Sequence, residues 1–153
     1  MPAQSIQTVN QGTQVLISWD YPDDSADTII QYSIQIRQSD GLTFTETVEC
    51  DGSNTLVVSS RSCLVNLSTL RAAPYSLAFD DYIVASIASM NSFGWSIYSQ
   101  PNTGGAKIWT EPQQMLIPVY LPLQSDGYSM TIQLSALSSY TETGGSVVDS
   151  YHL

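Results

Sequence analysis

Apolar and polar residues alternate along much of the first 110 residues, and few apolar positions recur at helical spacing. Such alternation is typical of β-strands that bury one face. Turn-forming clusters of Gly, Asn, Asp and Pro separate the alternating stretches. The pattern predicts seven strands, near residues 5–9, 15–19, 32–37, 44–48, 63–67, 83–89 and 106–110. Their number and spacing favour an all-β antiparallel sandwich, with Trp19 in its core.

Charge restricts the classes of partner. The 153 residues carry 14 acidic and four basic side chains, a net charge of −10. Binding to nucleic acid or to an anionic membrane requires clustered Lys and Arg, so we expect neither partner. Apolar runs are also far shorter than a membrane span, so we expect no direct membrane insertion of this segment.

Residues for the common catalytic mechanisms are missing from the sequence. Its single histidine, His152, is the second-last residue, and no Gly-x-Ser-x-Gly, Ser-x-x-Lys or Gly-rich phosphate loop occurs. We therefore expect a protein that is not an enzyme, with no catalytic residues and no cofactor.

Cys50 and Cys63 lie 13 positions apart, between the fourth and fifth predicted strands. They are either two free core thiols or a disulfide. The even count, and the absence of a Cys-x-x-Cys motif or a histidine nearby, favour the disulfide. A disulfide implies an oxidising compartment, whereas two cysteines alone cannot complete a zinc site.

Three further features are candidate sites. Asn66-Leu67-Ser68 is an N-glycosylation sequon, which also arises by chance in a chain rich in Ser and Thr. Phe93 and Trp95 flank Gly94 in a predicted turn, where they form an interface or where Trp95 folds over the sheet. A weak Ca²⁺ candidate is an acidic loop that we expect to be solvated rather than metal-bound; it contains Asp20, Asp23, Asp24 and Asp27.

The order of landmarks resembles a fibronectin type III domain over about residues 3–112. Val15-x-Ile17-x-Trp19-x-x-Pro22 and Ile29-x-x-Tyr32-x-Ile34-x-Ile36 are similar to its B and C strands. Residues 67–94 are similar to its E–F corner, F strand and F–G turn, and Ser96-x-x-Ser99 to its approach to strand G. The cysteine pair and the insert at 70–80 most resemble tandem repeats of large ciliate surface and secreted proteins. One departure is that Ile83 occupies the position of the corner tyrosine, so the resemblance implies that the cysteine link replaces that restraint.

The strand pattern starts again after Pro112. Met130-x-Ile132-x-Leu134 repeats the pattern of 15–19, and Val148-x-x-Tyr151-x-Leu153 repeats that of 29–34, at offsets of 115 and 119 residues. A repeat of this size is typical of a tandem array. We therefore expect a first domain over 1–112, then a linker and the opening strands, A to C, of a second fibronectin type III-like unit over 113–153. A partial sandwich cannot bury its apolar face, so we expect a longer chain or completion by another copy, with Met130, Ile132, Leu134 and Tyr151 as interface residues.

These observations predict a structural or adhesive module of an extracellular or cell-surface tandem-repeat protein, a unit of a filament or multi-domain array. The expected partners are neighbouring repeats or copies of the chain, with glycans or other surface proteins as further candidates. The alternative is a receptor ectodomain module that binds a ligand or glycan through its loops.

Overall fold

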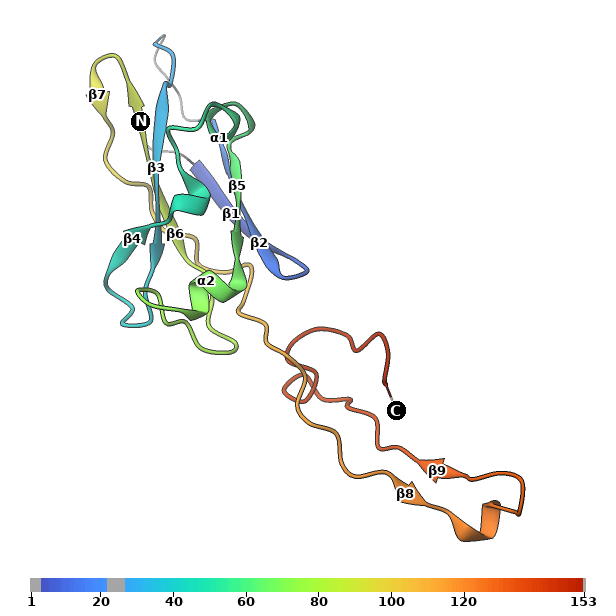
Figure 1. Cartoon of the computed structure of the whole chain (residues 1–153). Coiled ribbons are helices and arrows are strands. Elements are labelled where there is room, and N and C mark those ends of the chain that lie inside the picture. Colours follow the sequence, from blue (N-terminus) through green and yellow to red (C-terminus); the bar gives the residue numbers. More distant parts are fainter. Residues whose placement is uncertain (1–3, 22–26, 153) are drawn as a thin grey trace. The chain divides into compact units, whose positions relative to one another are not determined.

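The computed structural model describes residues 4–21 and 27–152. The chain divides into two compact units, Met1–Ile108 and Trp109–Leu153. The first unit is an all-β, immunoglobulin-like sandwich of two antiparallel sheets (Figure 1). One sheet has the strand order β1-β2-β5, built from β1 (Gln4–Gln11), β2 (Gln14–Asp20) and β5 (Ser62–Asn66). The other has the order β4-β3-β6-β7, built from β3 (Gln31–Arg37), β4 (Phe44–Glu46), β6 (Ala85–Asn91) and β7 (Gly94–Trp95).

The core contains the inward-facing residues of both sheets. Val15, Ile17 and Trp19 of β2 are buried at every second position, as period-two alternation requires. Trp19 contacts Tyr32 of β3 edge to face, with 5.1 Å between the ring centroids. The predicted inward faces of β2 and β3 are therefore confirmed.

Three short helices interrupt the strand pattern, and the alternation of the sequence did not predict them. After β4, Thr47 caps a 3₁₀ turn, η1 (Val48–Cys50), which shortens the predicted strand 44–48. The side chain of Asn54 accepts a hydrogen bond from the Leu56 N–H and caps α1 (Thr55–Ser60); α2 (Leu67–Arg71) directly follows β5. Helices of one or two turns are too short to produce a recognisable apolar period.

The last predicted strand, 106–110, lies at an edge instead of forming a continuous strand. Lys107 forms an isolated bridge to Tyr82, and the Ala106 N–H donates to the Thr8 carbonyl at 2.9 Å. The segment therefore joins β1 of one sheet to the residues that precede β6 of the other.

Side chains replace part of the ladder between β6 and the segment that follows β7. Three polar residues spaced three apart accept hydrogen bonds from β6 N–H groups spaced two apart. They are Ser96, Ser99 and Asn102, which accept from Ser89, Ile87 and Ala85 at 3.0, 3.0 and 2.7 Å. We call these three residues the polar ladder.

The insert between α2 and β6 is fixed by a buried tyrosine. Tyr75 is 2% exposed, and its hydroxyl donates to the Glu46 carbonyl at 2.7 Å. Burial raises the pKa of this hydroxyl. Ile83, which precedes β6, is fully buried, so the tyrosine that restrains this part of the fold comes from the insert.

The second unit contains little regular structure. Two short antiparallel strands, β8 (Val119–Tyr120) and β9 (Ile132–Gln133), enclose a 3₁₀ turn, η2 (Pro122–Gln124). β9 falls inside the predicted strand 130–134, whereas Val148 and Tyr151 lie outside any strand. Within residues 4–21 and 27–152, every helix is too short or too polar to traverse a bilayer.

Candidate functional site

A groove of about 520 Å³ lies on the outer face of the β4-β3-β6-β7 sheet. Tyr32, Ile34 and Ile36 of β3 are buried in the core, so Ser33 between them lies on the opposite face. Ser33 is paired with Ala88 of β6, and both residues line the groove. The strand order then places β4 on one side of this floor and β7 on the other.

A chain of hydrogen bonds crosses the groove floor. The Ser33 hydroxyl donates to the Glu46 carboxylate, and the Ser33 and Tyr98 hydroxyl oxygens are 2.6 Å apart. Since the single Ser33 proton is directed to Glu46, Tyr98 is the donor to Ser33. This chain fixes a carboxylate on one side of the floor and an aromatic ring on the other.

A β-bulge accompanies Tyr98. The Ser96 N–H donates to the Ser89 carbonyl, and the Ser99 N–H donates to the Ile87 carbonyl. Three steps along this segment therefore match two steps along β6, which defines an extra residue at 97–98. Bulges redirect side chains, and here Tyr98 reaches Ser33 on the outer face.

The groove has acidic and aromatic walls. Its acidic members are Glu46 and Asp51, and no lysine, arginine or histidine is among its described lining residues. Hydrogen bonds from the side chain and backbone of Ser53 lower the pKa of the Asp51 carboxyl, so it is ionised at neutral pH. Trp95 and Tyr98 line the groove with 49% and 41% of their surface exposed.

The F–G turn presents the two aromatic side chains that the sequence singled out. Phe93 is 90% exposed, whereas Trp95 contributes to the groove wall. The side chain of Asp27 accepts hydrogen bonds from the backbone and the hydroxyl of Ser92, both at 2.9 Å, and so supports the turn. The turn therefore exposes both aromatic side chains without burying Trp95 fully.

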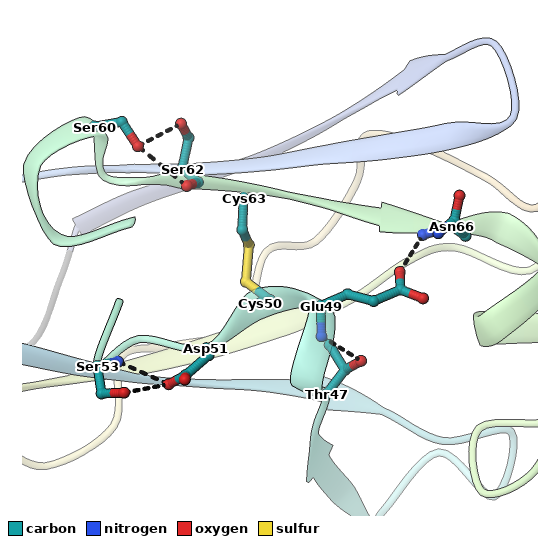
Figure 2. The surroundings of a disulfide bond; sticks show 9 residues. All are labelled: Thr47, Glu49, Cys50, Asp51, Ser53, Ser60, Ser62, Cys63 and Asn66. Atoms are coloured by element: carbon teal, nitrogen blue, oxygen red, sulfur yellow. Dashed lines mark hydrogen bonds between the residues drawn. A yellow bond between two sulfur atoms is a disulfide. The ribbon is translucent and has the colours of Figure 1, made fainter. Parts of the chain in front are cut away.

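Cys50 and Cys63 form a disulfide (Figure 2). It joins the end of η1 to β5, with a Cα–Cα distance of 5.3 Å and both residues buried. The Gly52 carbonyl then accepts from the Tyr32 N–H. A Cβ on Gly52 would lie 1.9 Å from the Tyr32 oxygen, so only glycine permits this close approach beside the groove.

A carboxylate next to the disulfide connects η1 to β5 and α2. Glu49 accepts hydrogen bonds from the Asn66 N–H and the Thr69 hydroxyl, both at 2.6 Å; Figure 2 shows the first. Burial opposes ionisation of Glu49, but the hydrogen bonds from Thr69 and Asn66 outweigh it and lower the pKa of the carboxyl. Asn66, the sequon residue, ends β5 at a partly exposed position and makes no side-chain cap of α2. Its glycosylation remains a prediction.

The structure describes two of the four acidic-loop residues that the sequence offered as a weak Ca²⁺ candidate. Asp20 is exposed at the end of β2, and Asp27 supports the F–G turn. Asp23 and Asp24 lie outside the described residues. Among the residues that the structure describes, no three His, Cys, Asp or Glu side chains are grouped to bind a metal ion.

The four predicted interface residues of the second unit are accessible to different extents. Met130 is 76% exposed, Ile132 and Tyr151 are slightly more than one-third exposed, and Leu134 is partly buried. Their role as an interface stays a prediction.

Sequence reasoning missed Ser33, Glu46 and Tyr98, the residues that make the groove. The alternation of β3 already placed Ser33 on the outer face. Glu46 and Tyr98 carried no comparable signal, because strand pairing and a bulge bring them to Ser33.

No family model and no curated protein matches the chain. Among solved structures, one titled "Myokine structure" is 17% identical with a TM-score of 0.45, covering 66% of this chain and 90% of that chain. The "Twitchin kinase region from C.elegans (Fn31-NL-kin-CRD-Ig26)" is also 17% identical, with a TM-score of 0.46 over 67% of this chain and 15% of that chain. The match thus spans only a small part of the twitchin region, and the fold is established here by the strand order.

Proposed function

We propose that the chain is a non-enzymatic structural or adhesive module of an extracellular or cell-surface protein, and that it belongs to a tandem array or filament. The observation that carries this proposal is the buried disulfide between η1 and β5. Disulfides form and persist in oxidising compartments and are rare in the reducing cytosol.

The second unit supports the array role. Its exposed apolar side chains include Leu116, Ile117, Leu123, Tyr128 and Val147, each more than 70% exposed. Large apolar patches on protein surfaces mark interaction sites, and the proposal takes these side chains to form one. Neighbouring repeats or further copies of the chain would cover this surface through β-structure of the same kind.

A non-enzymatic role agrees with the residue types in the first unit. The described lining of the groove contains two carboxylates and several hydroxyls, but no histidine, cysteine thiol or lysine to act as nucleophile or proton shuttle beside them. Fold alone does not decide function, so this part of the proposal is derived from the site residues.

Redox analysis of protein isolated from its native source tests the compartment. We expect no thiol labelling without reductant, two labelled cysteines after reduction, and an intact mass that rises by two hydrogen atoms on reduction. Labelling of Cys50 and Cys63 in untreated native protein would exclude both the disulfide and the oxidising compartment.

The groove favours a second candidate function, recognition of a partner. The alternative drawn from the sequence placed ligand binding in the loops, whereas the groove lies on the face of a sheet. Its volume falls within the range of roughly 300–1,000 Å³ that is usual for ligand sites.

A further inference from the structure

We propose that the groove on the β4-β3-β6-β7 sheet binds an arginine side chain presented by a basic segment of a different protein. This inference rests on the second function above, recognition through the first unit, and is independent of the array role.

Charge selects a cationic ligand. Glu46 and Asp51 are the charged residues among the described lining of the groove, and both are acidic. The whole chain carries a net charge of −10, so the surrounding field adds to the local attraction. An anionic ligand would be repelled, and a neutral one would leave both carboxylates without a counter-charge.

Geometry selects guanidinium among the cations. A carboxylate can accept about four hydrogen bonds, and Ser33 uses one of these positions on Glu46. The remaining positions can accept two parallel N–H groups from one ligand. The side chains of Trp95 and Tyr98 are partly exposed on the same groove. Guanidinium is planar, pairs with carboxylates through two parallel N–H groups and stacks on aromatic rings, whereas ammonium is a compact point charge.

A second copy of this chain is a poor source of that arginine. The sequence has only four basic side chains. Lys107 pairs with Asp80 at 2.8 Å, and Arg61 lies over the Tyr21 ring at 5.7 Å. With only three arginines in a chain of net charge −10, the proposal commits to a distinct, basic protein as the partner.

Nuclear magnetic resonance titration of the full chain tests this inference. The probes are N-acetyl-arginine methylamide, its neutral citrulline isostere, and neutral trisaccharides of glucose and of N-acetylglucosamine. We expect saturable shifts with the arginine probe at the Trp95 indole N–H and at the amides of Ser33, Glu46 and Tyr98. The citrulline and saccharide probes should leave these signals unchanged, and added salt should weaken arginine binding.

Variants locate the site. We expect Glu46→Gln and Trp95→Ala each to reduce affinity for the arginine probe about tenfold, as loss of a charge-assisted hydrogen bond or a stacking face implies. Matched controls lie in the second unit: Asp149→Asn removes another exposed carboxylate, and Tyr128→Ala removes another exposed ring. Both should bind like the unmodified chain. Because Trp95 is half exposed, its variant stays informative if Glu46→Gln disturbs the sheet.

Three results would overturn the inference. Equal binding of the arginine and citrulline probes would show that the positive charge of the ligand does not contribute to binding. If a saccharide binds and arginine does not, the proposed arginine ligand is wrong, but recognition of a partner through the groove remains the function. If no probe binds, both this inference and the recognition function fail, while the disulfide and array proposal is unaffected.

Discussion

Two tryptophans of the first unit have opposite environments. Trp19 is 4% exposed and packs on Tyr32 between the sheets, whereas Trp95 is 49% exposed beside the groove. The same residue type therefore stabilises the core at one position and forms an accessible surface at the other.

Replacement by alanine separates these roles. Trp19→Ala should reduce the free energy of unfolding by about 3–5 kcal/mol, because it empties a large buried site. This is a large share of the roughly 5–15 kcal/mol typical of a domain. Trp95→Ala should cost much less, since little of its burial is lost. Equal losses in denaturant unfolding would place Trp95 in the core and exclude it from the groove wall.

Glu49 provides a test of stability against pH. Its carboxyl has a lowered pKa in the folded state, so it contributes stability above its unfolded pKa, about 4.5, and loses that contribution as the pH falls through the folded pKa. Glu49→Gln should therefore lower stability at neutral pH and flatten the dependence of stability on pH below about 4.5. Urea unfolding at several pH values measures both effects. An unchanged slope in acid would show that Glu49 ionisation is not coupled to folding.

At the scale of elements, the edge after β7 is held by side chains as much as by backbone. The polar ladder supplies three acceptors to β6, and the bulge between its first two members directs Tyr98 to the groove. The segment 96–102 therefore both pairs with β6 and supplies Tyr98 to the groove.

Ser99→Ala tests the polar ladder. The hydroxyl of buried Ser99 accepts from the Ile87 N–H, and its loss should cost about 1–3 kcal/mol, the usual penalty for an unsatisfied buried group. Ser59→Ala on the exposed face of α1 is the matched control and should change little. If both variants have the same stability, the ladder does not stabilise the edge.

At the scale of the whole molecule, the two units differ in how much apolar surface they bury. The first has an extensive core between its sheets, whereas the second leaves large side chains such as Leu123 and Tyr128 fully exposed. In the proposed array, β-structure of neighbouring units would cover these side chains.

Comparing residues 1–112 with residues 1–153 tests that role. The shorter chain should be a stable monomer in sedimentation, because its core is contained in the first unit. The longer chain should self-associate or be cleaved by protease after about residue 112, because large apolar side chains of its second unit are exposed. A monomeric, protease-resistant longer chain would contradict the tandem-repeat interpretation of 113–153.

Local pattern was sufficient for much of the fold. The alternation at 15–19 and 32–37 identified two core strands and their inward faces, because burial on one side of a strand leaves a period of two in the sequence. The even cysteine count favoured the disulfide that the structure contains. The short helices and the place of Tyr75 left no such period, because a few local caps and one long-range hydrogen bond determine them.

The sequence by itself thus determined the strand pattern, the fold class, the acidic charge and the cysteine pair, since each depends on composition or on neighbours along the chain. Only the tertiary structure decided the groove. Glu46 and Tyr98 lie 13 and 65 positions from Ser33 along the chain. Pairing of β3 with β4 and β6, and of β6 with the segment after β7, brings the three side chains into contact. A site made of side chains from separate strands depends on register and on a bulge, and these are set by packing of the whole sandwich.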